Sequence, residues 1–427
     1  MRRWLLVLAL CGCGSNAQHG ADSGMPPPDD DGGVITDGGD SDGASSGGGG
    51  GGDMAMACAT RVDYGAAWIH AANHPASFDV ADGVVTWDRV CHDDGANSYA
   101  QLSNGWKPYF TGNGACALTL EYVASCGVYA NPVMPQGCAD PGVVHDGSRW
   151  IVACTSGNAA DAFPMRVSTD LVHWSAAGHI LPSAAKPAWA ASDFWAPEIH
   201  RVGAQWVAYF TARGQDGKLA IGAATAASAT GPFTAQATPL VHDANMGLID
   251  ATEFENSDGK KYLLWKEDGN AVGKPTPIHA QPLAADGLSL TGAPSTLITN
   301  DQAWEGAVVE GPWLVAHGGA YWLFYSGNSY ANASYAVGVA RASSPLGPYT
   351  KAAAPIVTSA GPWVGPGHCS VVDAPGGETV MLYHAWASGH VNGAGDARLM
   401  LVDRVAWGAD GWPTLPSAPS VATQPLP

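Results

Sequence analysis

A two-strand unit recurs five times in the part of the chain that begins near residue 138. Each instance has an apolar strand, a turn that contains Gly, and a second strand rich in aromatic and β-branched residues. The five instances are DPGVVHDGSRWIVACTS, APEIHRVGAQWVAYFTA, IDATEFENSDGKKYLLWK, EGPWLVAHGGAYWLFYS and GHCSVVDAPGGETVMLYHAW. Their second strands are spaced roughly 55–60 residues apart, within reach of the period of propeller blades.

Two further strands can be placed after the hairpins, for example PMRVSTD and HWSAAGHIL after the first. Four strands in each of five units predict an all-β fold, a five-bladed β-propeller. A single β-sandwich would show shorter and more regular strand spacing. The composition agrees, because charged residues make up only 13% of the 427 residues while Gly (55) and Trp (17) are abundant, as in β proteins with many tight turns.

The entrances of the five hairpins carry an unusual number of ionisable residues. Aligned by their turns, the hairpins place Asp140, Ala196, Asp250, Glu310 and His368 at equivalent positions. The first strand of each propeller blade lines the central axis, so these residues are predicted to meet at one end of the channel. The alternative is that each is an ordinary strand-end residue facing solvent. Three carboxylates beside apolar strands favour a site, because burial of a charge is costly unless it is paired or used.

Two carboxylates flanking a bond are the minimum for glycoside hydrolysis, where one acts as acid and the other as base or nucleophile. A third carboxylate nearby would raise the pKa of the acid. Other chemistries lack support. GxxxxGK[ST] and HExxH are absent, and GxSxG occurs only as GASSG in a Gly/Ser-rich segment that cannot form a strand-to-helix turn. The net charge of −19 argues against a nucleic-acid partner.

The ordered motifs resemble those of glycoside hydrolase family 43, five-bladed propellers that act with inversion on arabinose- and xylose-containing polysaccharides. ADPGVV resembles the base motif of the family, FWAPEI the second-blade motif, GLIDATEFENSDGKKYLL the third-blade motif, VVEGPW the general-acid motif and GPGHCSVV the last-blade motif. The resemblance covers roughly residues 138–415. The chain departs from the family at Ala251, where Pro is usual, and at Cys369, where other residues are common.

The resemblance implies the roles of the three carboxylates. Asp140 becomes the general base that activates water, Glu310 the general acid that protonates the leaving oxygen, and Asp250 the residue that modulates the pKa of the acid. Inversion requires the acid and the base to lie about 6.5–9.5 Å apart, which opposed positions around a channel could supply.

The resemblance also implies substrate-binding residues. Arg398, in DARLMLVDRV, resembles an arginine that reaches the first sugar subsite, and His368 resembles a histidine near the channel centre. In some members that histidine binds or adjoins calcium, so His368 is the metal candidate, although the chemistry requires no cofactor. Trp195 and Trp313 are candidate sugar platforms, with burial in the core as the alternative for each.

The segment before the repeat divides into three parts. Residues 1–13 resemble a bacterial lipoprotein signal peptide that ends in LCGC, with ordinary cleavage as the alternative. Residues 14–56 are an acidic Gly/Ser-rich tether that is predicted to be disordered. Residues 57–137 are predicted to form a small β-rich region stapled by disulfides, and residues 138–427 the propeller. We therefore expect an exported monomer that is either anchored to a membrane through lipid at Cys13 or secreted.

Export to an oxidising compartment predicts disulfides among the cysteines beyond the signal. They are Cys58, Cys91, Cys116, Cys126, Cys138, Cys154 and Cys369. The number is odd, so at least one is predicted to be free or paired elsewhere, and sequential pairing is the working hypothesis.

The sequence favours an inverting hydrolase of arabinan or arabinoxylan, either an arabinofuranosidase or an arabinanase. A β-xylosidase is the nearest enzyme alternative, and the choice between exo and endo action stays open. A non-catalytic glycan-binding propeller is an alternative of another class, disfavoured because such a protein needs no acid–base set. The absence of an Arg-Asp-Pro triplet disfavours a related fructan-active propeller.

Overall fold

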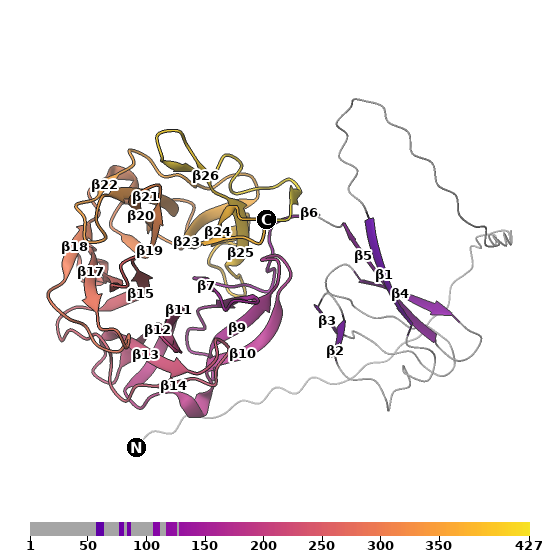
Figure 1. The fold of residues 1–427 in the computed structure, drawn as a ribbon, viewed down its shortest axis with the longest axis horizontal. Helices are drawn as coiled ribbons and strands as arrows, with labels where there is room; N and C mark the ends of the chain where they lie inside the picture. Colours follow the sequence, from indigo (N-terminus) through magenta and orange to yellow (C-terminus); the bar gives the residue numbers. More distant parts are fainter. Residues whose placement is uncertain (1–56, 64–76, 81–82, 87–105, 112–116, 126–127) are drawn as a thin grey trace, which may run out of the picture. The chain divides into compact units, whose positions relative to one another are not determined.

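The computed structural model describes residues 57–63, 77–80, 83–86, 106–111, 117–125 and 128–427. From residue 128 onward, Figure 1 shows β-sheets arranged radially around a common centre, with the chain passing once around the ring. Within each sheet the strand order follows the chain, and the first strand lies innermost. The predicted all-β, five-bladed propeller is confirmed.

The blades are antiparallel sheets built from consecutive strands. Blades one and two contain β7 (Gly142–His145), β8 (Trp150–Ala153), β9 (Ala162–Ser168), β10 (Ser175–Leu181), β11 (Ala190–Val202), β12 (Gln205–Gly214), β13 (Leu219–Ala226) and β14 (Thr234–Ala235). Blades three and four contain β15 (Leu248–Glu255), β16 (Lys261–Glu267), β17 (Ile278–Leu283), β18 (Ser295–Ile298), β19 (Val309–His317), β20 (Ala320–Gly327), β21 (Ala336–Ala342) and β22 (Thr350–Lys351). Blade five contains β23 (Trp363–Asp373), β24 (Thr379–Ala387) and β25 (Leu399–Arg404).

Blade five is completed by the segment that precedes blade one. The backbone N–H groups of Val133 and Met134 donate to the carbonyl of Met400 in β25, and that of Cys138 donates to the carbonyl of Arg398. Further out, β6 (Val128–Tyr129) pairs with β28 (Gln424–Pro425). The segment from Val128 to Cys138 therefore completes the last blade.

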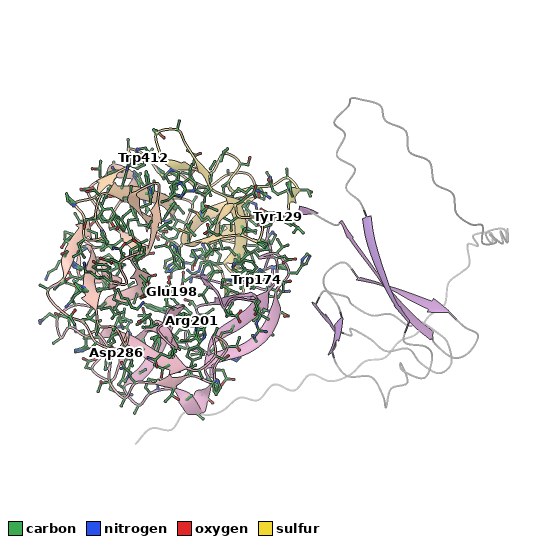
Figure 2. All side chains as sticks on the ribbon, viewed as in Figure 1. Tyr129, Trp174, Glu198, Arg201, Asp286 and Trp412 are labelled. Carbon is green, nitrogen blue, oxygen red and sulfur yellow. A yellow bond between two sulfur atoms is a disulfide. The ribbon has the colours of Figure 1, made fainter. Side chains whose placement is uncertain are left out.

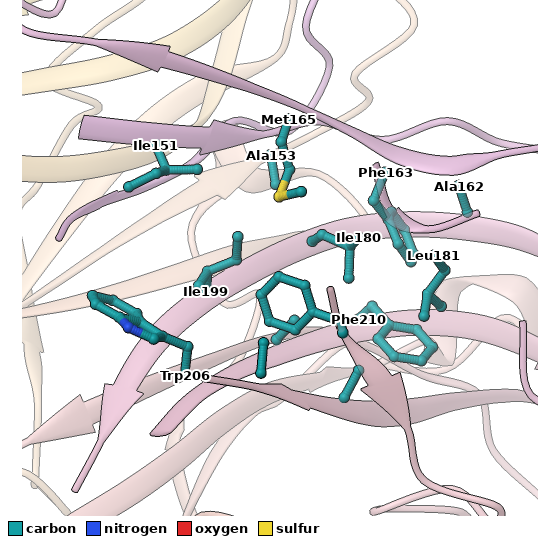
Figure 3. Close-up of a cluster of buried hydrophobic side chains, with 14 of the residues drawn as sticks. Ile151, Ala153, Ala162, Phe163, Met165, Ile180, Leu181, Ile199, Trp206 and Phe210 are labelled. Carbon is teal, nitrogen blue, oxygen red and sulfur yellow. The ribbon is translucent and has the colours of Figure 1, made fainter. Parts of the chain in front are cut away.

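A hydrophobic cluster fills each space between neighbouring blades. Between blades one and two, Ile151, Phe163, Ile199 and Phe210 pack together with no more than 2% of any side chain exposed (Figure 3). Burial of one such side chain stabilises the fold by about 1.5–3 kcal/mol. Each blade is thus held by two apolar interfaces, and the polar residues of the inner strands are free to line the channel.

Short strands are also described in the region before the propeller, and the small disulfide-stapled module predicted there stays a prediction. β1 (Ala57–Asp63), β5 (Ala117–Ser125) and β4 (Trp106–Thr111) form one sheet, and β2 (Ser77–Val80) pairs with β3 (Gly83–Thr86). The predicted signal peptide, tether and cysteine pairings of this region lie outside the described residues or side chains.

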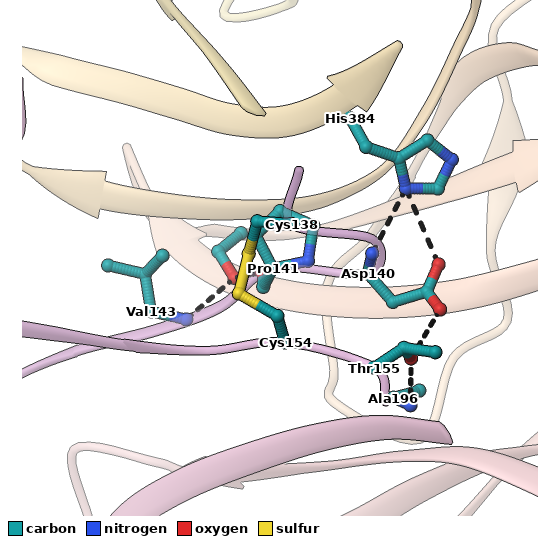
Figure 4. Close-up of a disulfide and its surroundings, with 9 residues drawn as sticks. Cys138, Asp140, Pro141, Val143, Cys154, Thr155, Ala196 and His384 are labelled. Carbon is teal, nitrogen blue, oxygen red and sulfur yellow. Dashed lines mark hydrogen bonds and ion pairs between the residues drawn. A yellow bond between two sulfur atoms is a disulfide. The ribbon is translucent and has the colours of Figure 1, made fainter. Parts of the chain in front are cut away.

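Two cysteine predictions fall on described residues. Cys138 and Cys154 form a disulfide, as the sequential pairing requires, and Cys369 is free and buried. The disulfide joins the residues that flank the first hairpin, before β7 and after β8, close to Asp140 (Figure 4). Among the described residues, none belongs to a helix that is long and apolar enough to cross a membrane.

Candidate active site

The inner strands contain bulges at the place where the candidate residues lie. In blades two, three and five, the pairing between the first two strands skips two residues there. The first skipped residue has a left-handed backbone, with φ of 45° at Ala196, 59° at Asp250 and 50° at His368, and Asp140 before β7 has φ of 53°. We call these the bulge residues. A non-Gly residue in this conformation is destabilising by roughly 1–2 kcal/mol, so the surrounding fold must impose it.

The bulge corrects the alignment of blade four. The register shift lies between Glu310 and Trp313, and Gly311 is the residue with positive φ, at 56°. Gly311 is therefore the bulge residue, and Glu310 precedes it, at the position that Trp195 occupies in blade two. The predicted alignment of Glu310 with the other entrance residues was therefore wrong by one position. A Cβ on Gly311 would lie 3.1 Å from Nδ1 of His368, so the close approach of blade five also favours Gly here.

All six predicted site residues line one cavity of about 340 Å³. Its walls come from all five blades, because Asp140 belongs to blade one, Trp195 to blade two, Asp250 to blade three, Glu310 to blade four and His368 to blade five. Arg398, at the start of β25, completes the predicted set. The lining also includes residues that the sequence did not single out, namely Ile249, Lys266, Asp268, Asn270, Val308, Asn328, Ser329 and Tyr330.

Asp140 is held as a carboxylate. Its Oδ1 accepts from Nη1 of Arg398 at 2.6 Å and lies 3.3 Å from Nδ1 of His368, and its Oδ2 accepts from Oγ1 of Thr155 at 2.6 Å (Figure 4 shows Thr155). Burial opposes ionisation, but these groups together keep the pKa of Asp140 well below its usual range. His384 plays another part: burial lowers its pKa, and its Nδ1 accepts the backbone N–H of Asp140 at 3.1 Å.

Glu310 is fixed by two donors. Its Oε2 lies 3.0 Å from Nζ of Lys266, and its Oε1 accepts from the hydroxyl of Tyr335 at 2.8 Å. Lys266 also donates to Oδ1 of Asp268 at 3.1 Å. Lys266 and Tyr335 escaped the sequence reasoning, because neither lies in a hairpin entrance and only the fold brings them to Glu310.

Asp250 is the carboxyl group of the three whose pKa is raised by burial. Burial, with smaller contributions from Glu310 and Asp140, raises the pKa of Asp250 to about 6 despite the opposing charges of His368 and Lys266. Its Oδ2 accepts the backbone N–H of Gly311 at 3.0 Å, directly beside Glu310. The cavity therefore holds one carboxyl group that stays ionised and a second that gains a proton near pH 6.

Two tryptophans and two further glutamates of the propeller lie in different environments. Trp195 lines the cavity, whereas Trp313 packs against the cluster between blades four and five and donates to the carbonyl of Val371. Glu198, near the centre of the ring in Figure 2, accepts from Oγ1 of Thr252 at 2.7 Å. Glu305 is fully buried and bonds to Lys351. Trp313 therefore does not line the cavity as the platform interpretation requires, and both glutamates make their contacts outside the cavity lining.

The calcium prediction rests on His368. Burial opposes protonation of this imidazole, but Asp140, Asp250 and Glu310 raise its pKa, and its Nδ1 lies 3.3 Å from Oδ1 of Asp140. Within the described part of the chain, no group of three or more His, Cys, Asp or Glu side chains is arranged to hold a metal ion. A hydrated calcium ion beside His368 stays a prediction, and no catalytic step is derived through it.

Carboxyl groups that line one cavity in different environments are the arrangement that glycoside hydrolases use. Glycosyl hydrolases family 43 matches residues 129–413, and the chain belongs to that family. Family 43 enzymes act with inversion of configuration.

Curated relatives and a solved structure agree with this assignment. The chain is 29% identical to the extracellular exo-α-(1→5)-L-arabinofuranosidase of Streptomyces avermitilis over 52% of this chain and 49% of the relative, so it spans about half of that protein. It is 30% identical to the same-named protein of Streptomyces chartreusis over 60% of this chain and 82% of the relative. It is 27% identical to the β-D-galactofuranosidase of Aspergillus niger over 66% and 83%. The crystal structure of a thermostable family-43 glycoside hydrolase aligns with a TM-score of 0.65 and 33% identity. The alignment covers 70% of this chain and 99% of that structure.

Proposed function

We propose that the protein is an inverting glycoside hydrolase that releases arabinofuranosyl units from arabinan or arabinoxylan. One observation carries the proposal: three carboxyl groups line one cavity, each in a different hydrogen-bonding environment. Asp140 is the base, Glu310 the acid and Asp250 the modulator of the acid.

The chemistry follows from these environments. Asp140 accepts a proton from a water molecule as the water oxygen attacks the anomeric carbon. The bond from that carbon to the leaving oxygen breaks, Glu310 donates its proton to the leaving oxygen, and the configuration inverts. The ion pair with Arg398 helps to keep Asp140 ionised, the state in which it can accept a proton from water. The bond of Asp250 to the N–H of Gly311 fixes the backbone that carries Glu310.

The substrate class is supported by the names of the relatives, two of which are arabinofuranosidases and one a galactofuranosidase. A furanosyl unit is consistent with a cavity of about 340 Å³, which holds one or two sugar rings and has an exposed tyrosine, Tyr330, at its edge. A non-catalytic glycan-binding role would leave the buried ionisable set at Asp140, Asp250 and Glu310 without a purpose.

The first test is incubation of the purified protein with debranched arabinan, arabinoxylan, and aryl α-L-arabinofuranoside, β-D-galactofuranoside and β-D-xylopyranoside. Arabinose with inverted configuration, followed by NMR of the anomeric proton, would support the proposal. Release of galactose or xylose would agree with the proposed mechanism but would change the assigned substrate. Polysaccharide binding without any product, or a product of retained configuration, would overturn the mechanism.

Asp140→Asn provides the matched control for that test. The substitution preserves the size of the side chain but removes the base, so hydrolysis should be lost whatever the leaving group. Added azide should not yield a product of retained configuration, because the inverting reaction forms no covalent intermediate.

We also propose that the protein is exported, with Cys13 as a site of lipid attachment. Support comes from the extracellular naming of the Streptomyces relatives and from the Cys138–Cys154 disulfide, which is typical of oxidising compartments. Fractionation of a bacterial host that expresses the wild type or Cys13→Ala tests the anchor: membrane association that survives the substitution would exclude it.

A further inference from the structure

The backbone N–H of each bulge residue is satisfied by the neighbouring blade. In four of the five blades, that N–H donates to a side chain on or just after the second strand of the preceding blade: Ala196 to Oγ1 of Thr155 (2.7 Å), Asp250 to Oγ1 of Thr211 (3.1 Å), His368 to Oγ of Ser326 (2.7 Å) and Asp140 to Nδ1 of His384 (3.1 Å). We call these side chains the bulge acceptors. They join each blade to the next through a buried hydrogen bond.

Blade three breaks this pattern. In the second strands, Thr211, Ser326 and His384 pair with the residue that precedes the bulge residue of their own blade, and Lys266 has the same register opposite Ile249. A lysine ammonium has three donors and no acceptor, so Lys266 cannot satisfy the N–H of Gly311. Oδ2 of Asp250 accepts that N–H instead, at 3.0 Å.

The exception places a cation in the wall of the cavity. The Lys266 side chain is only 1% exposed, and its ammonium lies 3.0 Å from Glu310 and 3.1 Å from Asp268. A buried cation is unfavourable unless it is paired, and the other blades achieve the same backbone contact with a small hydroxyl or a neutral imidazole. Blade packing therefore does not account for lysine at this position, whereas the neighbouring carboxyl groups do.

We infer that Lys266 is a positioning residue for Glu310, which it holds through Oε2 while Tyr335 holds Oε1. The inference rests on the proposed function, because it assumes that Glu310 is the acid. When Glu310 gives up its proton, the ammonium stabilises the carboxylate that forms, at a fixed distance and with little rearrangement. The groups that face this pair from the surrounding elements are Asp140, Asp250, Asp268, Tyr335 and His368.

The position offers a natural test variant. Lys266→Thr introduces the residue found at the equivalent place in blade two, Thr211, whose hydroxyl accepts the N–H of the next bulge residue. The variant should therefore fold. Lys266→Arg retains the charge with a different geometry. Lys351→Met is the matched control, because Lys351 is also a buried lysine, 7% exposed, paired with Glu305 outside the cavity.

The readout is the dependence of kcat/KM on the leaving group, measured with aryl glycosides of the sugar that the wild type releases. Lys266→Thr should lose about 100-fold on alkyl or natural leaving groups, which need a proton from the acid, and less than about tenfold on a dinitrophenyl leaving group, which does not. Lys266→Arg should recover part of the difference. The alkaline limb of the pH profile should move to higher pH in Lys266→Thr, since the carboxyl pair keeps a proton more readily without the cation.

Lys351→Met should lower the Tm and leave the leaving-group dependence as in the wild type. Equal losses of Lys266→Thr on all leaving groups, or an unchanged alkaline limb, would overturn the inference and assign Lys266 a structural role only. A wild-type protein that cleaves no glycoside would refute the proposed function instead, so the two failures are distinguishable.

Discussion

Nη1 of Arg398 lies 2.6 Å from Oδ1 of Asp140, although 258 residues separate them in the chain. Arg398 leads into the third strand of blade five, and Asp140 stands at the entrance of blade one, so the pair spans the junction where the ring closes. The ring of Tyr330 covers the guanidinium, with 4.9 Å from its centroid to Cζ. The contact between Arg398 and Asp140 therefore both joins blade five to blade one and stabilises the ionised form of the proposed base.

Arg398→Met should shift the acid limb of the pH profile of kcat/KM to higher pH. Burial then dominates the environment of Asp140, whose pKa rises, so the base becomes protonated over a wider acidic range. The loss of activity should be greater at pH 5 than at pH 8. Arg149→Met, which removes a partly exposed ion pair with Asp146, is the control and should leave the profile unchanged. An equal loss at both pH values would show that Arg398 acts only on the substrate.

Glu310→Gln should preserve the fold and lower kcat by two to four orders of magnitude on poor leaving groups, the range typical of a general acid. The amide keeps an oxygen for Tyr335 and can no longer supply a proton. Turnover of a dinitrophenyl glycoside should fall much less. Unchanged turnover on natural polysaccharide would remove Glu310 from the role of acid.

Asp250→Asn should make the protein more stable at neutral pH while reducing its activity. The folded-state pKa of about 6 exceeds the ordinary value of 3.8, so stability declines as the pH rises through this interval and the penalty persists above pH 6. The difference corresponds to at most about 3 kcal/mol, and asparagine cannot ionise. Thermal unfolding should place the variant above the wild type at pH 7 and level with it below about pH 4. A variant that is less stable than the wild type at pH 7 would contradict the raised pKa of Asp250.

Tyr330→Ala should raise KM for oligosaccharides by about fivefold to tenfold, because an exposed aromatic ring at the rim of a sugar site stacks on the apolar face of a pyranose or furanose. Tyr330 is 45% exposed and lines the cavity. Tyr330→Phe should behave as the wild type, and Val421→Ala, at an exposed apolar residue outside the cavity lining, should have no effect. A fall in kcat with an unchanged KM would point to the contact with Arg398 instead.

The fold and most of the site could be predicted because they depend on local signals. Each hairpin is recognisable from its turn and its apolar strands. The ionisable residues Asp140, Asp250 and His368 are conspicuous beside these apolar strands. The offset at Glu310 could not be predicted, because a bulge changes the register without changing the hydrophobic pattern. Only the positive φ of Gly311 reveals it.

The contacts between blades could not be predicted from the sequence for a different reason. Lys266 reads as an ordinary strand residue in KKYLLWK, and Tyr335 as a residue near a strand end. Their meeting at Glu310 depends on how adjacent blades pack, which no local pattern records. Trp313 illustrates the converse, since a tryptophan near Glu310 in the sequence lies half-buried against a hydrophobic cluster and does not line the cavity.

The closure of blade five by residues on both sides of the repeat has a consequence for biosynthesis. The segment around Val133 and Met134 emerges from the ribosome early but finds its partner, Met400, only after four whole blades have followed it. Until then one apolar flank of the first blade stays uncovered, and Asp140 lacks Arg398. The ion pair that holds the proposed catalytic base can therefore form only after blade five has been synthesised.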